Sequence, residues 1–232
     1  MKNKIALYSA LLLSLGGIAT TGVSAFADAT DSNATSNATI KFLPGDGVTP
    51  PVDPDDPDNP DPGTDPEDPG NGGTGEVGPL SIDYVSNLSF GEQKISGANA
   101  VYEAKNTTPR IQVTDTRGDK KAGWRLSATA SPFTGQDADA QNVVLRGTEL
   151  SLKNGTTVTT TGNNSAAPTV SDVVLDGSST AVDVMTAAPD SGQGTWVDKY
   201  AASDVTLKVP AGSAENGVDY TSTIEWNLVS AP

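Results

Sequence analysis

Basic residues of this acidic chain gather in one short stretch. The chain has 14 lysines and arginines against 29 aspartates and glutamates. Asp115 and Arg117 lie two positions apart, so they can share one face of a strand and form an ion pair or bind a ligand carboxylate through two guanidinium nitrogens. We expect ligand contacts from this stretch, with ordinary solvated surface pairs as the alternative. Its cations are Arg110, Arg117, Lys120, Lys121 and Arg125.

The tripeptide Trp-x-Leu occurs twice and contains two of the three tryptophans. The first copy is Trp124-Arg125-Leu126, and the second is Trp226-Asn227-Leu228. Residues i and i+2 of a strand point to one face, so each copy places an indole beside a leucine. Alternating polar neighbours indicate half-buried strands, which favours tryptophans that pack in the core. The alternative is that an indole stacks on a sugar ring, and Trp196 is a third candidate for that role.

The chain contains neither cysteine nor histidine. Disulfides, thiolate or histidine metal sites and nucleophiles activated by histidine are therefore excluded. A glycosidase would need two carboxylates at a defined separation, and no such pair stands out among the many acids. We expect a non-catalytic protein without a cofactor or a metal site. The acidic balance also makes nucleic acid an unfavourable partner.

The sequence predicts four segments. Residues 1–27 have the form of a signal peptide, with two lysines, an apolar run and an Ala25-Phe26-Ala27 cleavage site. No other segment is apolar enough to span a membrane, so the mature chain should carry none. Residues 28–43 are short and polar, although Ala38 to Phe42 could add as a strand to a sheet edge of this chain or of a neighbour. Residues 80–232 form the fourth segment.

Residues 44–79 are dominated by proline, aspartate and glycine. The prolines block helix and sheet, and the carboxylates repel one another, so we expect a disordered linker that acts as a spacer. In polyproline II it would reach on the order of 100 Å. Calcium binding is a weaker alternative, because the aspartates do not have the spacing of a calcium-binding loop.

Residues 80–232 are rich in valine, threonine and glycine, and no segment has a helical period. We predict an all-β domain, an antiparallel sandwich or barrel-like unit. Asn154-Gly155 is typical of a type I′ hairpin between two strands. The expected strands are 80–85, 87–95, 99–104, 110–115, 122–130, 142–152, 155–160, 180–186, 194–199, 204–209 and 219–229.

Several of these motifs together resemble the WxL domain, a C-terminal module of secreted surface proteins of low-GC Gram-positive bacteria. They are Asp115-Thr116-Arg117-Gly118, Gly123-Trp124-Arg125-Leu126, Leu207 to Pro210 and the final Trp226-Asn227-Leu228. Their ordered combination is far more specific than one Trp-x-Leu alone. The resemblance implies a small WxL protein at the cell surface, attached non-covalently to the cell wall, with peptidoglycan as the expected partner.

Two further readings stay open. The chain could instead be a protein–protein interaction subunit of a surface complex, or an adhesin that binds host matrix proteins. Arg117-Gly118-Asp119 spells the tripeptide of integrin ligands, but a match of three residues arises easily by chance. For attachment to the cell wall, the candidate wall-binding residues are Trp124, Leu126, Trp226 and Leu228, and the possible ligand contacts are Asp115, Arg117, Lys120, Lys121, Arg125 and Trp196.

Overall fold

A computed structural model describes residues 33–231 of the chain. The predicted signal peptide at 1–27 lies outside these residues. The chain divides into a unit that ends at Lys41 and a compact unit that begins at Phe42. In the first unit, residues 33–41 form neither helix nor strand. Among the described residues no helix is long and apolar enough to cross a membrane.

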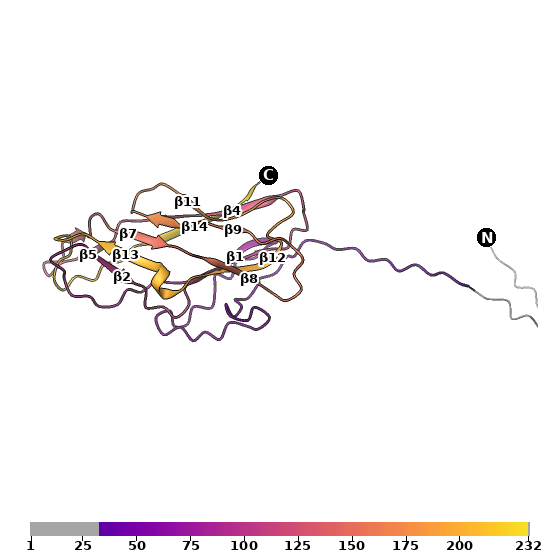
Figure 1. Cartoon of the computed structure of the whole chain (residues 1–232), viewed down its shortest axis with the longest axis horizontal. Coiled ribbons are helices and arrows are strands. Elements are labelled where there is room, and N and C mark those ends of the chain that lie inside the picture. The colour runs from indigo at the N-terminus through magenta and orange to yellow at the C-terminus, as the bar shows by residue number, and fades with distance from the viewer. Residues whose placement is uncertain (1–32, 232) are drawn as a thin grey trace, which may run out of the picture. The chain divides into compact units, whose positions relative to one another are not determined.

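The compact unit is built from three four-stranded sheets and one hairpin, and all strand pairs are antiparallel (Figure 1). This confirms the all-β prediction. The first sheet has the order β1 (Leu80–Val85), β3 (Arg110–Asp115), β12 (Gly194–Lys199) and β8 (Thr156–Thr159). The second has the order β10 (Val173–Leu175), β7 (Glu149–Leu152), β13 (Val205–Val209) and β2 (Ala100–Glu103). The third has the order β14 (Ile224–Ala231), β4 (Gly123–Ala130), β11 (Val182–Ala187) and β9 (Thr169–Val170), and the hairpin joins β5 (Thr134–Gln136) to β6 (Asn142–Val144).

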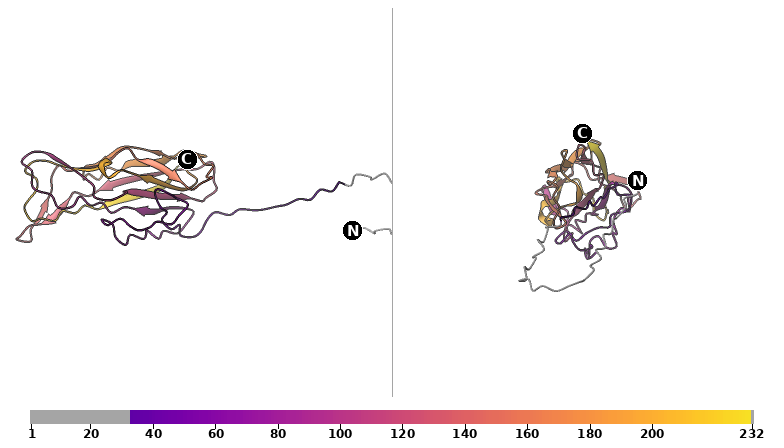
Figure 2. Two further views of the ribbon diagram at one scale, coloured as in Figure 1. Left: turned by 60° about the horizontal axis from the view of Figure 1, so that its bottom comes forward. Right: turned by 90° about the vertical axis from the view of Figure 1, so that its right-hand side faces the viewer.

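The sheets form a two-layered sandwich. The third sheet makes one layer, and the first and second sheets lie end to end in the other (Figures 1 and 2). Fully buried side chains from both layers meet between them, among them Trp124 and Leu126 of the third sheet, Val113 of the first and Leu150 of the second. The alternating pattern of each strand thus supplies one apolar face to a shared core.

Some predicted strands differ from the observed ones. Residues 87–95 form a loop instead of a strand, and β5, β9 and β10 were not predicted. The expected hairpin at Asn154-Gly155 is wrong, because β7 before it and β8 after it belong to different sheets. Asn154 does have a positive φ of 52°, but its amide N–H bonds to Asp172 and its side chain to Asp204. The turn therefore carries the chain from one sheet to another.

The expected spacer also differs from the structure. Residues 45–76, which we call the strap, lie against the first sheet on the side away from the third (Figure 2). The strap hydrogen-bonds to the edge of β1, where the Thr74 amide N–H donates to the Asp83 carbonyl at 2.9 Å. On the outer face of the sheet, the Gln112 side chain accepts from the Val52 amide and donates to the Pro50 carbonyl. The outer face of the first sheet is therefore buried even though it carries polar residues.

The aspartates of the strap explain its ordered path. Asp53, Asp61 and Asp65 each accept a hydrogen bond from the backbone N–H two residues on, which stabilises a tight turn between the prolines. Other carboxylates accept from groups of the β domain instead of repelling one another. Asp68 accepts from the Tyr84 hydroxyl and from Asn87, and Asp61 pairs with the buried Arg110 at 2.5 Å.

Candidate functional site

The two Trp-x-Leu copies lie side by side on neighbouring strands. In the antiparallel pairing of β4 with β14, Leu126 lies opposite Leu228, Trp124 opposite Ser230 and Trp226 opposite Ala128. The pair of leucines is therefore the centre of a local two-fold arrangement, with the indoles displaced in opposite directions. Directly opposed residues share one face of a sheet, so all four side chains point toward the core layer.

Trp124 is a core residue. Its side chain is completely buried, and its indole N–H donates to the Gly192 carbonyl at 3.1 Å. Gly192 has a φ of 68°, and a Cβ there would lie 2.7 Å from the indole nitrogen. A glycine is thus required on both counts for this contact. Leu126 beside Trp124 is also fully buried.

Trp226 is only half-buried, as is Leu228. Both pack against the edge of the core, and Trp226 also lines a groove described below. Its indole N–H makes no hydrogen bond within residues 33–231, in contrast to that of Trp124. Trp196, the third candidate, is 5% exposed, and its indole N–H donates to the Gln193 carbonyl at 2.9 Å. Trp226 is therefore the one tryptophan that reaches a surface.

Arg117 connects three parts of the domain. Its guanidinium binds both carboxylate oxygens of Asp115, at 3.0 and 2.8 Å. It also donates to the Gly123 carbonyl and to the Ser230 hydroxyl, at 3.0 and 2.6 Å. The hydrogen bonds to Asp115 raise the pKa of Arg117. The Asp-x-Arg-Gly motif thus ties β3 to the start of β4 and the end of β14, and its charged groups are already occupied within the chain.

The remaining cations do not form one patch. Lys120 and Arg125 are exposed and lie near acids, Asp190 at 3.3 Å and Asp183 at 3.4 Å. Lys121 is also exposed. Arg110 lies at the other end of β3, roughly 17 Å from Asp115 by strand rise. There it pairs with the strap and stacks on the Tyr84 ring. The exposed cations of this stretch therefore lie in the turn before β4 and on β4 itself, and other exposed cations, such as Lys94, Lys105 and Lys153, lie elsewhere on the domain.

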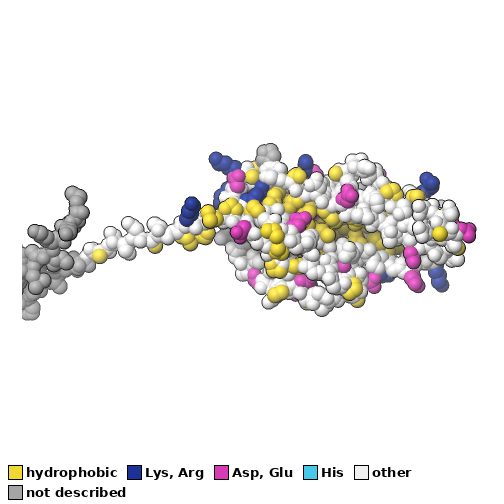
Figure 3. Space-filling view, turned by 180° about the vertical axis from the view of Figure 1, so that it is seen from behind, with side chains coloured by type: hydrophobic (Ala, Val, Ile, Leu, Met, Phe, Trp, Pro, Cys, Tyr) yellow, Lys and Arg dark blue, Asp and Glu magenta, His cyan; other side chains and the backbone are white. Residues whose placement is uncertain are grey.

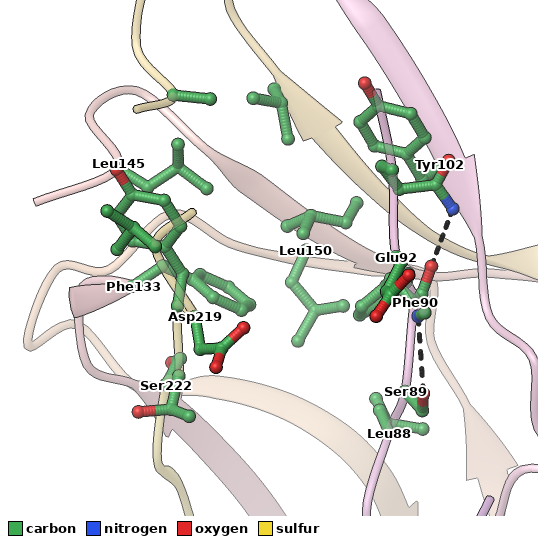
Figure 4. A pocket seen from close by; sticks show the side chains of 18 of the residues that line it. Leu88, Ser89, Phe90, Glu92, Tyr102, Phe133, Leu145, Leu150, Asp219 and Ser222 are labelled. Atoms are coloured by element: carbon green, nitrogen blue, oxygen red, sulfur yellow. Dashed lines mark hydrogen bonds between the residues drawn. The ribbon is translucent and has the colours of Figure 1, made fainter. Parts of the chain in front are cut away.

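A groove of about 1190 Å³, lined by both apolar and polar residues, opens between the second and third sheets. Its walls come from residues 85–98, from β2 and β13, and from residues 210–226, which include the start of β14. Figure 4 shows Phe133 and Leu145 on one side, Phe90 and Tyr102 on the other, and Leu150 between them. A band of hydrophobic side chains also follows a hollow in the surface of the molecule (Figure 3).

Aliphatic side chains make up much of the groove lining, together with five aromatic residues. The aromatic residues are Phe90, Tyr102, Phe133, Tyr220 and Trp226, and the larger aliphatic ones are Leu88, Ile95, Leu145, Leu150, Leu207, Val209, Val218 and Ile224. Three of the charged lining residues are acidic, namely Glu92, Glu215 and Asp219, against one lysine, Lys94. The groove is thus an exposed part of the core with an acidic rim.

The sequence predicts the strand that carries Trp226 but not the groove. The walls come from segments about 120 residues apart in the chain, and the loop 87–95 was expected to be a strand. The one available signal was the alternation from Tyr220 to Leu228, which indicated a half-buried strand. It gave no information on what covers the apolar face of that strand.

Two buried acids have raised pKa values but lie outside the groove. Burial raises the pKa of Asp198 to about 7, against the effect of a hydrogen bond from the Tyr200 hydroxyl. Burial also raises the pKa of Asp83, which accepts from Ser81, Thr114 and Gln112. Within residues 33–231, no group of three acidic side chains is arranged to hold a metal ion. Neither Asp83 nor Asp198 is among the residues that line the groove.

Comparison with protein families gives one result. The model of the WxL domain, described as a surface cell wall-binding domain, matches residues 29–232. Neither the curated proteins nor the solved structures yielded a match. The matched region includes the strap, so the family pattern extends well beyond residues 80–232, where sequence motifs placed it. The chain belongs to the WxL family of cell wall-binding surface domains.

Proposed function

We propose that this protein is a non-catalytic surface subunit, held on the wall by peptidoglycan, whose groove binds an extended polypeptide. Cell-wall attachment is the property of the family. The polypeptide ligand and the peptidoglycan ligand are the two finer parts of the proposal. Each rests on its own surface of the compact unit and each has its own test.

The main support for a polypeptide ligand is the open edge of β14 beside the groove. β14 has eight residues and pairs only with β4. On its other side, no backbone hydrogen bond to β14 is formed by any part of the chain that the structure describes. Ile224 and Trp226 of this strand also line the groove. An unpaired edge with an adjacent, partly apolar groove is the arrangement to which a peptide adds as a further strand.

Two other edges of the sandwich, those of β1 and β2, are covered. The strap hydrogen-bonds to the edge of β1 through Thr74. Beside β2 runs the loop 86–98, and the amide of Lys105, two residues after β2, donates to the Ser89 carbonyl of this loop at 2.8 Å. Natural sheet proteins protect their edges in such ways, so a long edge left open beside exposed core points to a partner.

The leucines of the groove and the open strand edge beside it favour a polypeptide over a sugar. A glycan site needs polar groups that converge on the hydroxyls of each ring, with aromatic faces beneath. Here Leu145, Leu150 and Leu207 line the groove beside polar residues such as Asn87, Gln93 and Asn216, and leucine side chains offer no hydrogen bonds to hydroxyl groups. Apolar side chains of a strand would instead gain the full benefit of burial against them.

The exposed cations before and within β4 support peptidoglycan as the wall ligand. Lys120, Lys121 and Arg125 project from an otherwise acidic molecule. Carboxylates of peptidoglycan stem peptides would be attracted to them. Trp124 and Leu126 support this surface from the core and do not reach the ligand, because both are fully buried.

Sedimentation with purified, protein-free sacculi tests the wall ligand. The intact protein should sediment with them, and the Lys120→Glu/Lys121→Glu variant should lose most of this binding. A Lys153→Glu/Lys105→Glu variant has the same change in charge at other positions and is the matched control. If the intact protein stays in the supernatant, direct peptidoglycan binding is wrong.

A pair of model peptides tests the groove. An eight-residue peptide of alternating lysine and isoleucine should bind, as measured by the fluorescence anisotropy of a label at its end. A peptide of the same composition with the lysines and isoleucines in two blocks is the control, because it cannot place all isoleucines on one face of a strand. Binding should be lost in Phe90→Asp. Equal binding of both peptides, or displacement by soluble glycan fragments, would contradict a strand-binding groove.

A further inference from the structure

The most exposed large apolar side chains of the described chain lie together near its N-terminal end. Ile40, Phe42 and Leu43 are 80%, 82% and 76% exposed. They lie in residues 36–43, which we call the arm, and the arm forms neither helix nor strand. We infer that the arm of one copy of this protein is the polypeptide that occupies the groove of a second copy. This inference rests on the strand-binding groove proposed above.

The arm has the pattern of a strand with one apolar face. Ala38, Ile40 and Phe42 alternate with Thr39 and Lys41, so the first three would point together into the groove. Threonine, isoleucine and phenylalanine also favour strands. At about 3.3 Å per residue the eight residues of the arm span about 26 Å, the length of the eight-residue β14.

Charge favours the same occupant. Lys41 is the only charged residue in 33–43, and it alternates with the apolar residues so that it would point away from the groove floor. The groove rim carries Glu92, Glu215 and Asp219 against Lys94. A strand with one cation therefore matches a rim with an excess of carboxylates.

The donor and the acceptor surfaces lie on different parts of the chain. Gly45, just after the arm, is fixed to the compact unit because its amide N–H donates to the Thr116 carbonyl at 3.1 Å. Phe42 and Leu43, only three and two residues before it, are exposed and therefore not held in the groove of their own chain. Because the contact joins two unlike surfaces, it can repeat from copy to copy, and the inferred product is an open chain or a closed ring of several subunits.

Complementation between two defective variants is the decisive experiment. The arm variant Ile40→Asp/Phe42→Asp keeps its groove, and the groove variant Phe90→Asp keeps its arm. In sedimentation velocity, the secreted protein should form species that grow with concentration, and each variant alone should be a monomer. An equal mixture of the two should give dimers and nothing larger, because only one arm and one groove remain functional.

A charge exchange removes the risk that a groove variant simply misfolds. Lys41→Glu should weaken association roughly tenfold, as expected for one reversed charge near an interface. Glu92→Lys/Asp219→Lys in the partner should restore it. The control Asn33→Asp adds a negative charge to the N-terminal segment outside the arm, and association should be unchanged.

Three results would overturn the inference, and they separate it from the proposed function. If the arm variant associates as strongly as the original protein, or the mixture stays monomeric, the arm is not the occupant. If the original protein is monomeric and its arm is protected from proteolysis, the arm binds within its own chain. In all three cases the groove remains a strand-binding site if the alternating peptide still binds. Failure of that peptide as well would overturn both proposals.

Discussion

The two Trp-x-Leu copies have the same local sequence pattern and are related by the pairing of β4 with β14, yet they have different environments. Trp124 is completely buried and its indole N–H is bonded to Gly192. Trp226 is half-buried and lines the groove. The difference arises because β4 lies inside its sheet, between β14 and β11, whereas β14 lies at the edge. The position of a strand in its sheet therefore decides whether the same motif serves the core or a surface.

Replacement of the buried indole should have the largest effect on folding. We expect Trp124→Ala to lower the free energy of unfolding by about 3–5 kcal/mol, because it leaves a large cavity and an unpaired Gly192 carbonyl. Urea unfolding measures the loss, with Trp124→Phe as a milder control. A loss below about 1 kcal/mol would contradict the core role.

Replacement of Arg117 should have the second-largest effect on stability, because Arg117 fixes the end of β14 beside the buried tryptophan. Arg117→Ala leaves the buried Asp115 carboxylate without its main partner. We expect a loss of about 2–3 kcal/mol in the free energy of unfolding. Arg117→Lys keeps the charge but not the forked geometry and should recover only part of it. Full recovery with lysine would mean that charge alone matters.

Trp226→Ala should lower stability less than Trp124→Ala does, but it should abolish peptide binding in the groove. Because the side chain is half-buried, we expect a loss of about 1–2 kcal/mol in unfolding, together with loss of the alternating peptide from the groove. Denaturation and peptide anisotropy on the same sample measure both effects. If Trp226→Ala destabilised the protein as much as Trp124→Ala, the contrast between the two copies would be wrong.

The smallest expected effect is the coupling between the two motifs. Leu126 and Leu228 are directly opposed, so a double-mutant cycle with Leu→Ala at each position should give a coupling energy of about 0.5–1 kcal/mol. A cycle between Leu228 and Leu175, which lies on β10 of the other layer, is the control and should give a smaller value. Equal values in the two cycles would argue against direct cross-strand contact.

Sequence patterns predicted the fold class and the strands that bury one apolar face. The alternation around Trp124 and Trp226 was sufficient to orient both side chains inward, as the structure has them. It was not sufficient to distinguish an interior strand from an edge strand, because both have the same period. The strand order depends on pairings such as β3 with β12, about 80 residues apart, which no local pattern encodes.

The groove and the strap were missed for a related reason. Each depends on what lies over a sheet, which is decided by contacts between distant segments. In the strap, proline and aspartate content indicated disorder, but Asp58, Asp65 and Asp68 accept hydrogen bonds from specific donors of the β domain. Composition shows that such a segment cannot form its own core, and it does not show that another surface can order it.

The way in which the strap is fastened should make it tolerant of salt. Only two of its attachments in the described chain are ion pairs, Asp61 with Arg110 and Asp55 with Lys199. The others are hydrogen bonds in which at least one partner is uncharged, and dissolved ions screen these far less than an exposed ion pair. For Asp68, burial alone would raise the pKa, but hydrogen bonds from Asn71, Asn87 and Tyr84 hold it below the ordinary value of 3.8. Its contribution to stability is therefore complete above that pH and is lost only as the solution becomes more acidic. A surface protein fastened in this way keeps its shape while the ionic strength around the cell changes.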